Sequence, residues 1–204
     1  LVPDPKSLRK VPWAREPTAQ IIADCYKASG EPHPLASRNV LKNILSLYQQ
    51  AGLRAEVAPE VEFYLVHKNT DPDYELMPPK GRSGRREVAR MSFSIDAVAE
   101  FEDFVEDMYD FADEQALSVD TLIHENGAAQ LEINFNHGDP LDMADQVFVF
   151  KRTVRETAQK HGMYATFMAK PMQKEPGSAL HIHQSILSVQ SGQNIFNDPD
   201  QQPT

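Results

Sequence analysis

The 204-residue chain is acidic, with 30 Asp and Glu residues against 20 Lys and Arg and a formal net charge of −10. This balance argues against nucleic acid or an anionic membrane as a partner, because both are bound through basic patches. No apolar stretch approaches the length that crosses a bilayer, and the single cysteine, Cys25, excludes an intrachain disulfide, which fits a reducing cytoplasm. We expect one large globular domain, or one domain with a fragment of another.

The N-terminal segment, residues 1–34, is rich in proline. Within it, residues 18–26 have the composition of one strand, and Ser29-Gly30-Glu31-Pro32 has that of a turn. One strand cannot form a domain, so the residues alone predict an ordered arm on the structure that follows.

A helix is predicted from Ser37, as its N-cap, to about Gln50, and a long strand from Arg54 to His67. This strand contains two acids, Glu60 and Glu62. They alternate with the apolar residues Val61, Phe63 and Leu65. Because successive side chains of a strand point to opposite faces, both carboxylates are expected to face one polar site while the apolar set faces a core.

Two further helices are predicted, from Asp96, as a cap, to about Gln115, and from about Pro140 to His161. Between the first strand and these helices, residues 68–90 have loop composition and contain the densest positive charge of the chain. This loop is either simply solvated or a flap near a phosphate or a subunit contact.

Strands are predicted over residues 118–124, 130–136 and 163–168. The first two are separated by Asn126-Gly127, a dipeptide typical of hairpin turns. Mixed helices and strands, with the strands expected to be antiparallel, indicate an α+β fold.

The stretch from Lys170 to Ser185 is the most informative one. Its turn, Pro176-Gly177-Ser178-Ala179, lacks bulky side chains, so that a ligand can approach the backbone closely. The following strand places His181 and His183 on the same face. Two imidazoles beside such a turn suit a metal ion, an anionic ligand, or one of each.

Several acids lie on strands with the same period of two, and an isolated Glu in an apolar strand is costly to bury unless a cation or donor compensates it. Oxygen ligands with one imidazole favour Mg²⁺ or Mn²⁺ over zinc. The predicted metal ligands are Glu60, Glu62, Glu125, Glu132 and His181.

Three motifs resemble the glutamine synthetase family. Residues 170–185 are similar to its ATP-site signature, 59–63 to its first metal-binding strand, and 124–132 to its second pair of metal carboxylates. The resemblance implies a curved, largely antiparallel sheet with flanking helices. It further implies that residues 1–34 end an N-terminal β-grasp domain and that 35–204 begin the catalytic domain, with further ligands beyond Thr204.

The resemblance also assigns roles to residues. Glu62, Glu125 and Glu132 match the catalytic carboxylates of one metal site, and Glu60 and His181 match ligands of a second. Residues matching nucleotide or substrate contacts are His183, Ser185 and Gly177. The implied activity is ATP-dependent joining of ammonia or a small amine to the γ-carboxyl of glutamate through γ-glutamyl phosphate, with two or more divalent ions. The implied assembly is a cytoplasmic homo-oligomer of the ring-stacked dodecamer type.

Two departures from the family pattern leave the amine open. Pro176 stands where many glutamine synthetases carry Asn, and the segment around Ser92 shows no counterpart of the family's pocket Tyr. The branch that joins glutamate to putrescine or other polyamines is therefore an alternative. Two alternatives of other classes are a non-catalytic binding or structural protein on the same fold, and a Mn²⁺ hydrolase with an unrelated carboxylate cluster.

Overall fold

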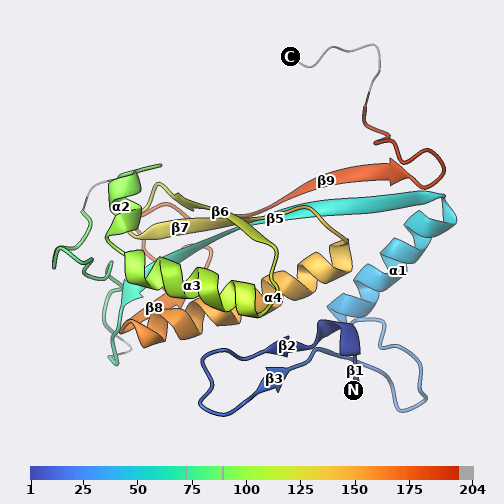
Figure 1. Ribbon diagram of the computed structural model, residues 1–204, viewed down its shortest axis with the longest axis horizontal. Coiled ribbons are helices and arrows are strands. Elements are labelled where there is room, and N and C mark those ends of the chain that lie inside the picture. The colour runs from blue at the N-terminus through green and yellow to red at the C-terminus, as the bar shows by residue number, and fades with distance from the viewer. Residues whose placement is uncertain (72, 89, 198–204) are drawn as a thin grey trace.

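A five-stranded antiparallel sheet is the frame of the computed structural model, which describes residues 1–71, 73–88 and 90–197 (Figure 1). Its strands are β5 (Leu53–His67), β6 (Val119–His124), β7 (Gln130–Phe135), β8 (Met163–Thr166) and β9 (Leu180–Ser188). β5 pairs with β7 on one edge, and β7 pairs with β6. On its other edge β5 pairs with β9 along residues 53–61 and with β8 along residues 64–67. The predicted α+β class with a largely antiparallel sheet is confirmed.

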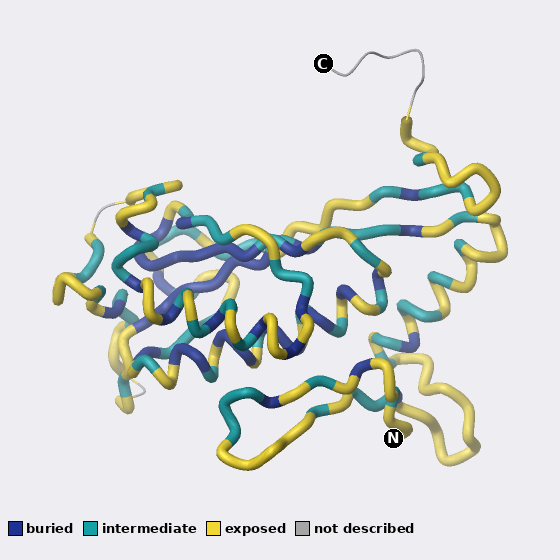
Figure 2. Tube along the Cα trace, in the orientation of Figure 1, coloured by how far each residue is buried: buried dark blue, intermediate teal, exposed yellow. Residues whose placement is uncertain are grey.

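Helices α3 (Glu102–Glu114) and α4 (Pro140–Lys160) cover one face of this sheet (Figure 1). The apolar core lies between them and the strands, and Figure 2 shows buried residues gathered there. Its fully buried members include Phe63, Leu65, Phe104, Met108, Phe150 and Val154. Each such side chain contributes about 1.5–3 kcal/mol by leaving water, so this layer fixes which face of β5 is left for polar residues.

Two shorter elements flank this layer. Helix α1 (Ser37–Gln50) packs along β5, and α2 (Ile95–Ala99) packs near β6. Ala36 occupies the cap position of α1 without a side-chain hydrogen bond, so the predicted cap at Ser37 is wrong; Ser37 is the first helical residue. Among the described residues, no helix combines the length and the apolar character that crossing a membrane requires.

The helix predicted over residues 96–115 is divided into α2 and α3. Ser94, rather than Asp96, caps the first part by accepting a hydrogen bond from Ala97 N at 3.2 Å. The chain leaves helical geometry at Phe101, where φ is −119° and ψ is 26°. The cause is tertiary, because the carbonyl of Glu100 accepts a hydrogen bond from Arg82 N at 2.9 Å.

The N-terminal segment contains two short strand pairs. β1 (Val2–Pro3) pairs with β4 (Ala23–Asp24), and β2 (Arg9–Lys10) pairs with β3 (Ala19–Gln20); a 3-10 turn, η1 (Pro5–Ser7), lies between β1 and β2. The single strand predicted over residues 18–26 is therefore wrong. It is interrupted at Ile22, whose N–H donates to the Ser7 hydroxyl at 2.8 Å and whose carbonyl accepts from Asp4 N at 2.9 Å.

Arg38 joins this segment to the helices. Its guanidinium donates to Asp4 and Asp24, each at 2.6 Å, and to Asp145 of α4 at 2.9 and 3.0 Å. The Arg38 side chain is only 14% exposed. Its hydrogen bond also holds the pKa of Asp4 below the ordinary value. One planar guanidinium with several fixed donors therefore connects three segments that are far apart in the sequence.

Candidate metal site

Strand register brings four of the predicted site residues onto one face of the sheet. Glu62 lies opposite Glu132 in the β5–β7 ladder, and Glu60 lies opposite His181 in the β5–β9 ladder. Directly opposite residues share a face, with Cβ atoms about 4.5–5.5 Å apart. The apolar residues that alternate with Glu60 and Glu62 belong to the core beneath α3 and α4, so the polar set lies on the other face. The predicted segregation of acids from core is confirmed.

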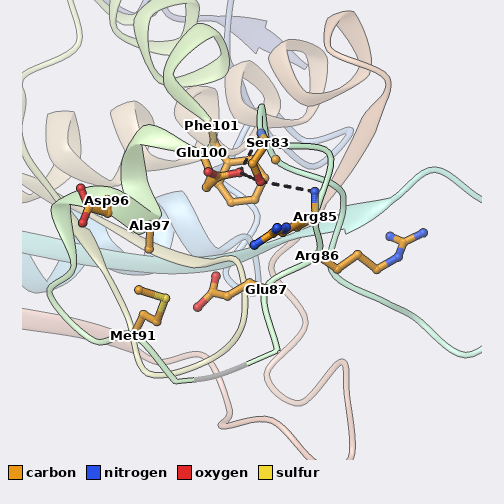
Figure 3. A pocket seen from close by; sticks show the side chains of 10 residues that line it. Ser83, Arg85, Arg86, Glu87, Met91, Asp96, Ala97, Glu100 and Phe101 are labelled. Atoms are coloured by element: carbon orange, nitrogen blue, oxygen red, sulfur yellow. Dashed lines mark hydrogen bonds between the residues drawn. The ribbon is translucent and has the colours of Figure 1, made fainter.

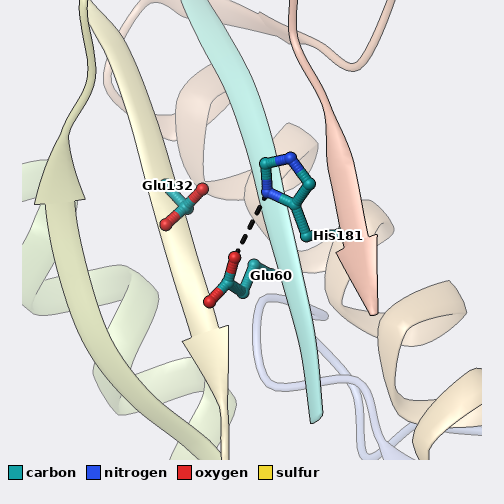
Figure 4. Close-up of side chains that lie close together, drawn as sticks. All are labelled: Glu60, Glu132 and His181. Carbon is teal, nitrogen blue, oxygen red and sulfur yellow. Dashed lines mark ion pairs between the residues drawn. The ribbon is translucent and has the colours of Figure 1, made fainter. Parts of the chain in front are cut away.

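Three of these side chains form a compact cluster. Glu60, Glu132 and His181 each offer one ligand atom, and these atoms lie within 4.8 Å of one another (Figure 4). His181 Nδ1 lies 3.2 Å from Glu60 Oε2. Two carboxylates and an imidazole around one point are a donor set that suits a hard divalent ion.

Glu132 is the most perturbed acid of this cluster. Burial raises the pKa of Glu132 to about 7, with further raising effects from Glu125, Glu60 and Glu62 and a lowering effect from His181. Glu125, which precedes β7 in a loop, is therefore close enough to belong to the same group of charges. Four carboxylates repel one another in such a site, and a bound cation offsets that repulsion. The residues present thus fit a divalent metal.

Glu62 is held in place by the polypeptide around it. Its Oε2 accepts hydrogen bonds from Gln130 Nε2 at 2.8 Å and from Ala179 N at 3.0 Å. Gln130 also donates to Gly177 O at 3.1 Å. Gln130 was not among the predicted site residues, although it shares the polar alternation of the Gln130-Leu131-Glu132 segment. It links the acid face to the small-residue turn.

The two histidines of β9 share one carboxylate. His181 approaches one oxygen of Glu60, and His183 Nε2 lies 2.8 Å from the other. Both imidazoles remain more than half exposed. Their predicted common face is confirmed. Ser185, the next residue on that face, lies opposite Glu56 and accepts a hydrogen bond from Asn194 instead, so the structure does not bring it into the cluster.

The turn before β9 is packed against neighbouring backbone. A Cβ added to Gly177 would lie 2.8 Å from Ala169 O, and Ser178 N donates to that same carbonyl at 2.8 Å. A side chain at Gly177 is thus excluded by the approach of Ala169. Gly177 itself is exposed, so its backbone is also accessible to a ligand.

The loop of residues 125–129 connects the antiparallel strands β6 and β7, which confirms the predicted hairpin. The left-handed residue is Ala129, with φ of 57°, and not Gly127. Gly127 is required for space, because an added Cβ would overlap the Tyr64 hydroxyl. That hydroxyl donates to Pro176 O at 2.7 Å. Tyr64 therefore contacts both the Glu125 loop and the small-residue turn.

Two acids outside the predicted set hold the backbone of this loop. Glu175 Oε2 accepts from Ala128 N at 3.1 Å, and Glu87 Oε2 accepts from Ala129 N at 2.8 Å. Neither had a sequence signal, because Glu87 lies in the segment noted only for its basic charge and Glu175 lies in a loop with no regular period. Contacts of this kind depend on tertiary structure.

The comparison with protein families gives one match over most of the chain. A family model described as the catalytic domain of glutamine synthetase matches residues 34–204. Among curated proteins, the chain is 33% identical over 193 residues to a glutamine synthetase of Pyrococcus horikoshii, covering 95% of this chain and 40% of that protein. It is 34% identical over 194 residues to the gamma-glutamylputrescine synthetase PuuA of Escherichia coli, covering 93% and 41%.

The chain is also similar to a third curated protein and to a solved structure. A glutamate–isopropylamine ligase of Pseudomonas sp. is 33% identical over 205 residues, covering 98% of this chain and 43% of the ligase. A solved structure titled "Apo GmaS without ligand" superposes with a TM-score of 0.81 at 28% identity, covering 97% of this chain and 45% of that one. The chain thus spans less than half the length of these relatives.

Proposed function

The chain belongs to the glutamine synthetase family, and from this premise we propose that the protein is an ATP-dependent ligase. It joins ammonia or a small amine to the γ-carboxyl of glutamate by way of γ-glutamyl phosphate. The observation that carries the proposal is the convergence of Glu60, Glu132 and His181 on one face of the sheet. A scaffold that had lost catalysis would have no reason to keep this cluster intact.

We assign one divalent ion, Mg²⁺ or Mn²⁺, to Glu62, Glu125 and Glu132, and a second to Glu60 and His181. Ions held by these residues would supply positive charge to offset that of the phosphate groups. Gln130 and Ala179 N fix one oxygen of Glu62, which leaves its second oxygen for a ligand. The remaining assignments, to the nucleotide and the amino acid substrate, are His183, Ser185 and Gly177.

The wider assignment concerns domains and assembly. The family match begins at residue 34; we propose residues 1–34 as the end of a β-grasp domain and 35–204 as the first part of the catalytic domain. We propose a homo-oligomer of the ring-stacked dodecamer type, located in the cytoplasm. One exposed cysteine is compatible with a reducing compartment.

The test is release of phosphate from ATP by the intact enzyme. Release is expected to require glutamate, an amine and Mg²⁺ or Mn²⁺ together. Glu132→Ala is expected to lower kcat by about 100-fold or more, because loss of a partner that only orients a metal ligand already costs about 10–100-fold. Glu114→Gln, which changes an exposed acid at the end of α3, is the control and should leave kcat unchanged. A rate of phosphate release that does not depend on glutamate or amine would overturn the proposal.

A second candidate, a small alkyl amine in place of ammonia, is favoured by Pro176. The interaction that the structure shows for Pro176 uses its backbone carbonyl, which accepts from Tyr64. The side chain therefore offers no amide to a substrate, unlike Asn. The Ser92 hydroxyl donates a hydrogen bond to the side-chain oxygen of Asn126, the residue that follows Glu125. A pocket with fewer polar walls discriminates less against alkyl amines, since each buried methylene contributes about 0.8 kcal/mol, or about fourfold in affinity.

Pro176→Asn separates the two candidates, because Asn keeps the backbone carbonyl that Tyr64 uses. The measurement is kcat/KM for ammonium, putrescine and isopropylamine in the wild type and in this variant. We expect the wild type to turn over an alkyl amine and Pro176→Asn to shift preference toward ammonium. If the wild type shows strong preference for ammonium and no turnover of either alkyl amine, the second candidate is wrong and the first stands.

A further inference from the structure

Glu87 lies at the boundary between a surface pocket and the loop that carries Glu125. The pocket, about 290 Å³, is lined by residues between Gly81 and Glu87, by Met91, and by residues of α2 and the turn after it; Figure 3 shows Glu87 on its wall. Only 10% of the Glu87 side chain is exposed. Its carboxylate thus belongs to the interior, although it comes from a segment dominated by basic and polar residues.

One oxygen of Glu87 contacts both ends of the loop. Oε2 accepts a hydrogen bond from Ala129 N at 2.8 Å and lies 3.0 Å from His124 Nε2. His124 is the last residue of β6, and Ala129 is the last residue before β7. Glu125 lies between them. A single carboxylate oxygen therefore contacts both residues that flank the Glu125 loop, His124 and Ala129.

His124 transmits this contact to Glu125 itself. Its ring is fully buried, and Nδ1 lies 2.8 Å from the carbonyl oxygen of Glu125. Each ring nitrogen lies within hydrogen-bonding distance of an oxygen, so the imidazole bridges Glu87 to the Glu125 backbone. The His124 carbonyl in turn accepts from Phe93 N at 2.8 Å. The ring has no freedom to turn without losing a hydrogen bond.

We propose that Glu87 is a positioning residue for Glu125, acting through His124 and Ala129. The inference rests on the proposed function, in which Glu125 is a ligand of one of two divalent ions. Ala129 is held in a left-handed conformation that non-glycine residues rarely adopt, and the bond to Glu87 helps to fix it there. Without Glu87 the loop populates more conformations. Metal binding then has to order the loop, and this entropy cost lowers the affinity for the metal.

The experiment measures Mn²⁺ binding to the intact enzyme by the electron paramagnetic resonance of free Mn²⁺, together with kcat and the KM for ATP. For Glu87→Ala we expect about tenfold weaker binding at one of the two sites and a similar loss of kcat, the lower range for partners that orient metal ligands. The second site, at Glu60 and His181, and the KM for ATP should change less than about twofold. A purely structural role would lower thermal stability without separating the two Mn²⁺ constants.

Two further variants keep the result decisive. Glu87→Gln preserves an oxygen that accepts both hydrogen bonds but removes the charge, so it should weaken the same Mn²⁺ site by about threefold and no other. Glu100→Gln is the matched control, because Glu100 lines the same pocket but bonds Ser83 and is expected to leave both sites unchanged.

The outcomes are distinct. The inference, but not the proposed function, would be overturned if both Mn²⁺ dissociation constants of Glu87→Ala stay within twofold of the wild type. If the alanine variant does not fold, the same criterion applies to Glu87→Gln. A wild type with no Mn²⁺ binding and no amine-dependent phosphate release would overturn the proposed function, and the inference with it.

Discussion

Glu132 is expected to hold a proton near neutral pH whenever the metal is absent. Burial and the carboxylates of Glu125, Glu60 and Glu62 raise the pKa of Glu132 from the ordinary 4.5 to about 7, against a lowering effect of His181. The raised pKa means that the folded protein binds more protons than the unfolded chain between these two values. The contribution of this group to stability is therefore complete at low pH and declines as the pH rises from 4.5 through about 7.

The size of this effect follows from the shift. Raising the pKa of Glu132 from 4.5 to about 7 corresponds to about 3 kcal/mol between its two protonation states. Glu132→Gln removes the titrating group and keeps the side-chain shape. Potentiometric titration of the wild type and Glu132→Gln in a chelator should differ by about one proton with a midpoint near pH 7.

Metal provides the control for this experiment. A cation bound to the cluster favours the ionised carboxylate, so saturating Mg²⁺ should move the midpoint of the difference curve below the ordinary value of 4.5. A difference curve centred near 4.5 without metal would refute the reasoning, because it would mean that solvent or unaccounted cations already compensate the four acids. A midpoint that ignores Mg²⁺ would refute the assignment of Glu132 as a ligand.

Three other predictions concern stability and local geometry. Arg38→Ala should lower the free energy of unfolding by about 3 kcal/mol at pH 7, measured by chemical denaturation, because it removes the ion-pair partner of partly buried carboxylates. Burial raises the pKa of Asp24, but hydrogen bonds from Lys42 and Arg38 lower it overall. The difference in free energy of unfolding between variant and wild type should therefore shrink as the pH falls below 3.8. Gly127→Ala should reduce kcat and thermal stability, since the new methyl overlaps the Tyr64 hydroxyl; unchanged values of both would contradict the observed packing. Ala116→Gly should raise stability by about 0.5–1 kcal/mol, because residue 116 follows α3 with φ of 52°, and a lower melting temperature would show that the strain is compensated.

The long elements were predictable from the sequence because their periods are strong. β5 alternates acids with apolar residues over its central part, and α4 begins at Pro140 and ends just before Gly162, as predicted. The same alternation predicts a common polar face for Glu60 and Glu62, and the structure has it. A strand's period of two fixes which face a side chain takes, and ladder register then fixes its partner.

The remaining features depend on contacts between distant segments. Residues 18–26 are apolar enough for one strand, but Ser7 captures the N–H of Ile22 and divides it. Gly127 resembles a turn glycine, yet glycine is needed there because a larger residue would overlap the Tyr64 side chain. Glu87 lies in a basic loop, and its contacts with His124 and Ala129 form only in the folded protein. Local pattern carries no information about such partners.

The Glu125 loop and the small-residue turn before β9 are connected so closely that they are one unit. Tyr64 packs against Gly127 and bonds Pro176 O, Glu175 bonds the backbone of the loop, and Gln130 bonds Gly177 O. Under the proposed function, a substrate bound at the turn would change the free energy of ordering the loop, and a metal ion bound at the loop would change the substrate affinity of the turn by the same factor, since such coupling is reciprocal. Tyr64→Phe removes the hydroxyl that bonds Pro176 O, so in this variant the effect of Mn²⁺ on substrate affinity and the effect of substrate on Mn²⁺ affinity should become smaller by the same factor.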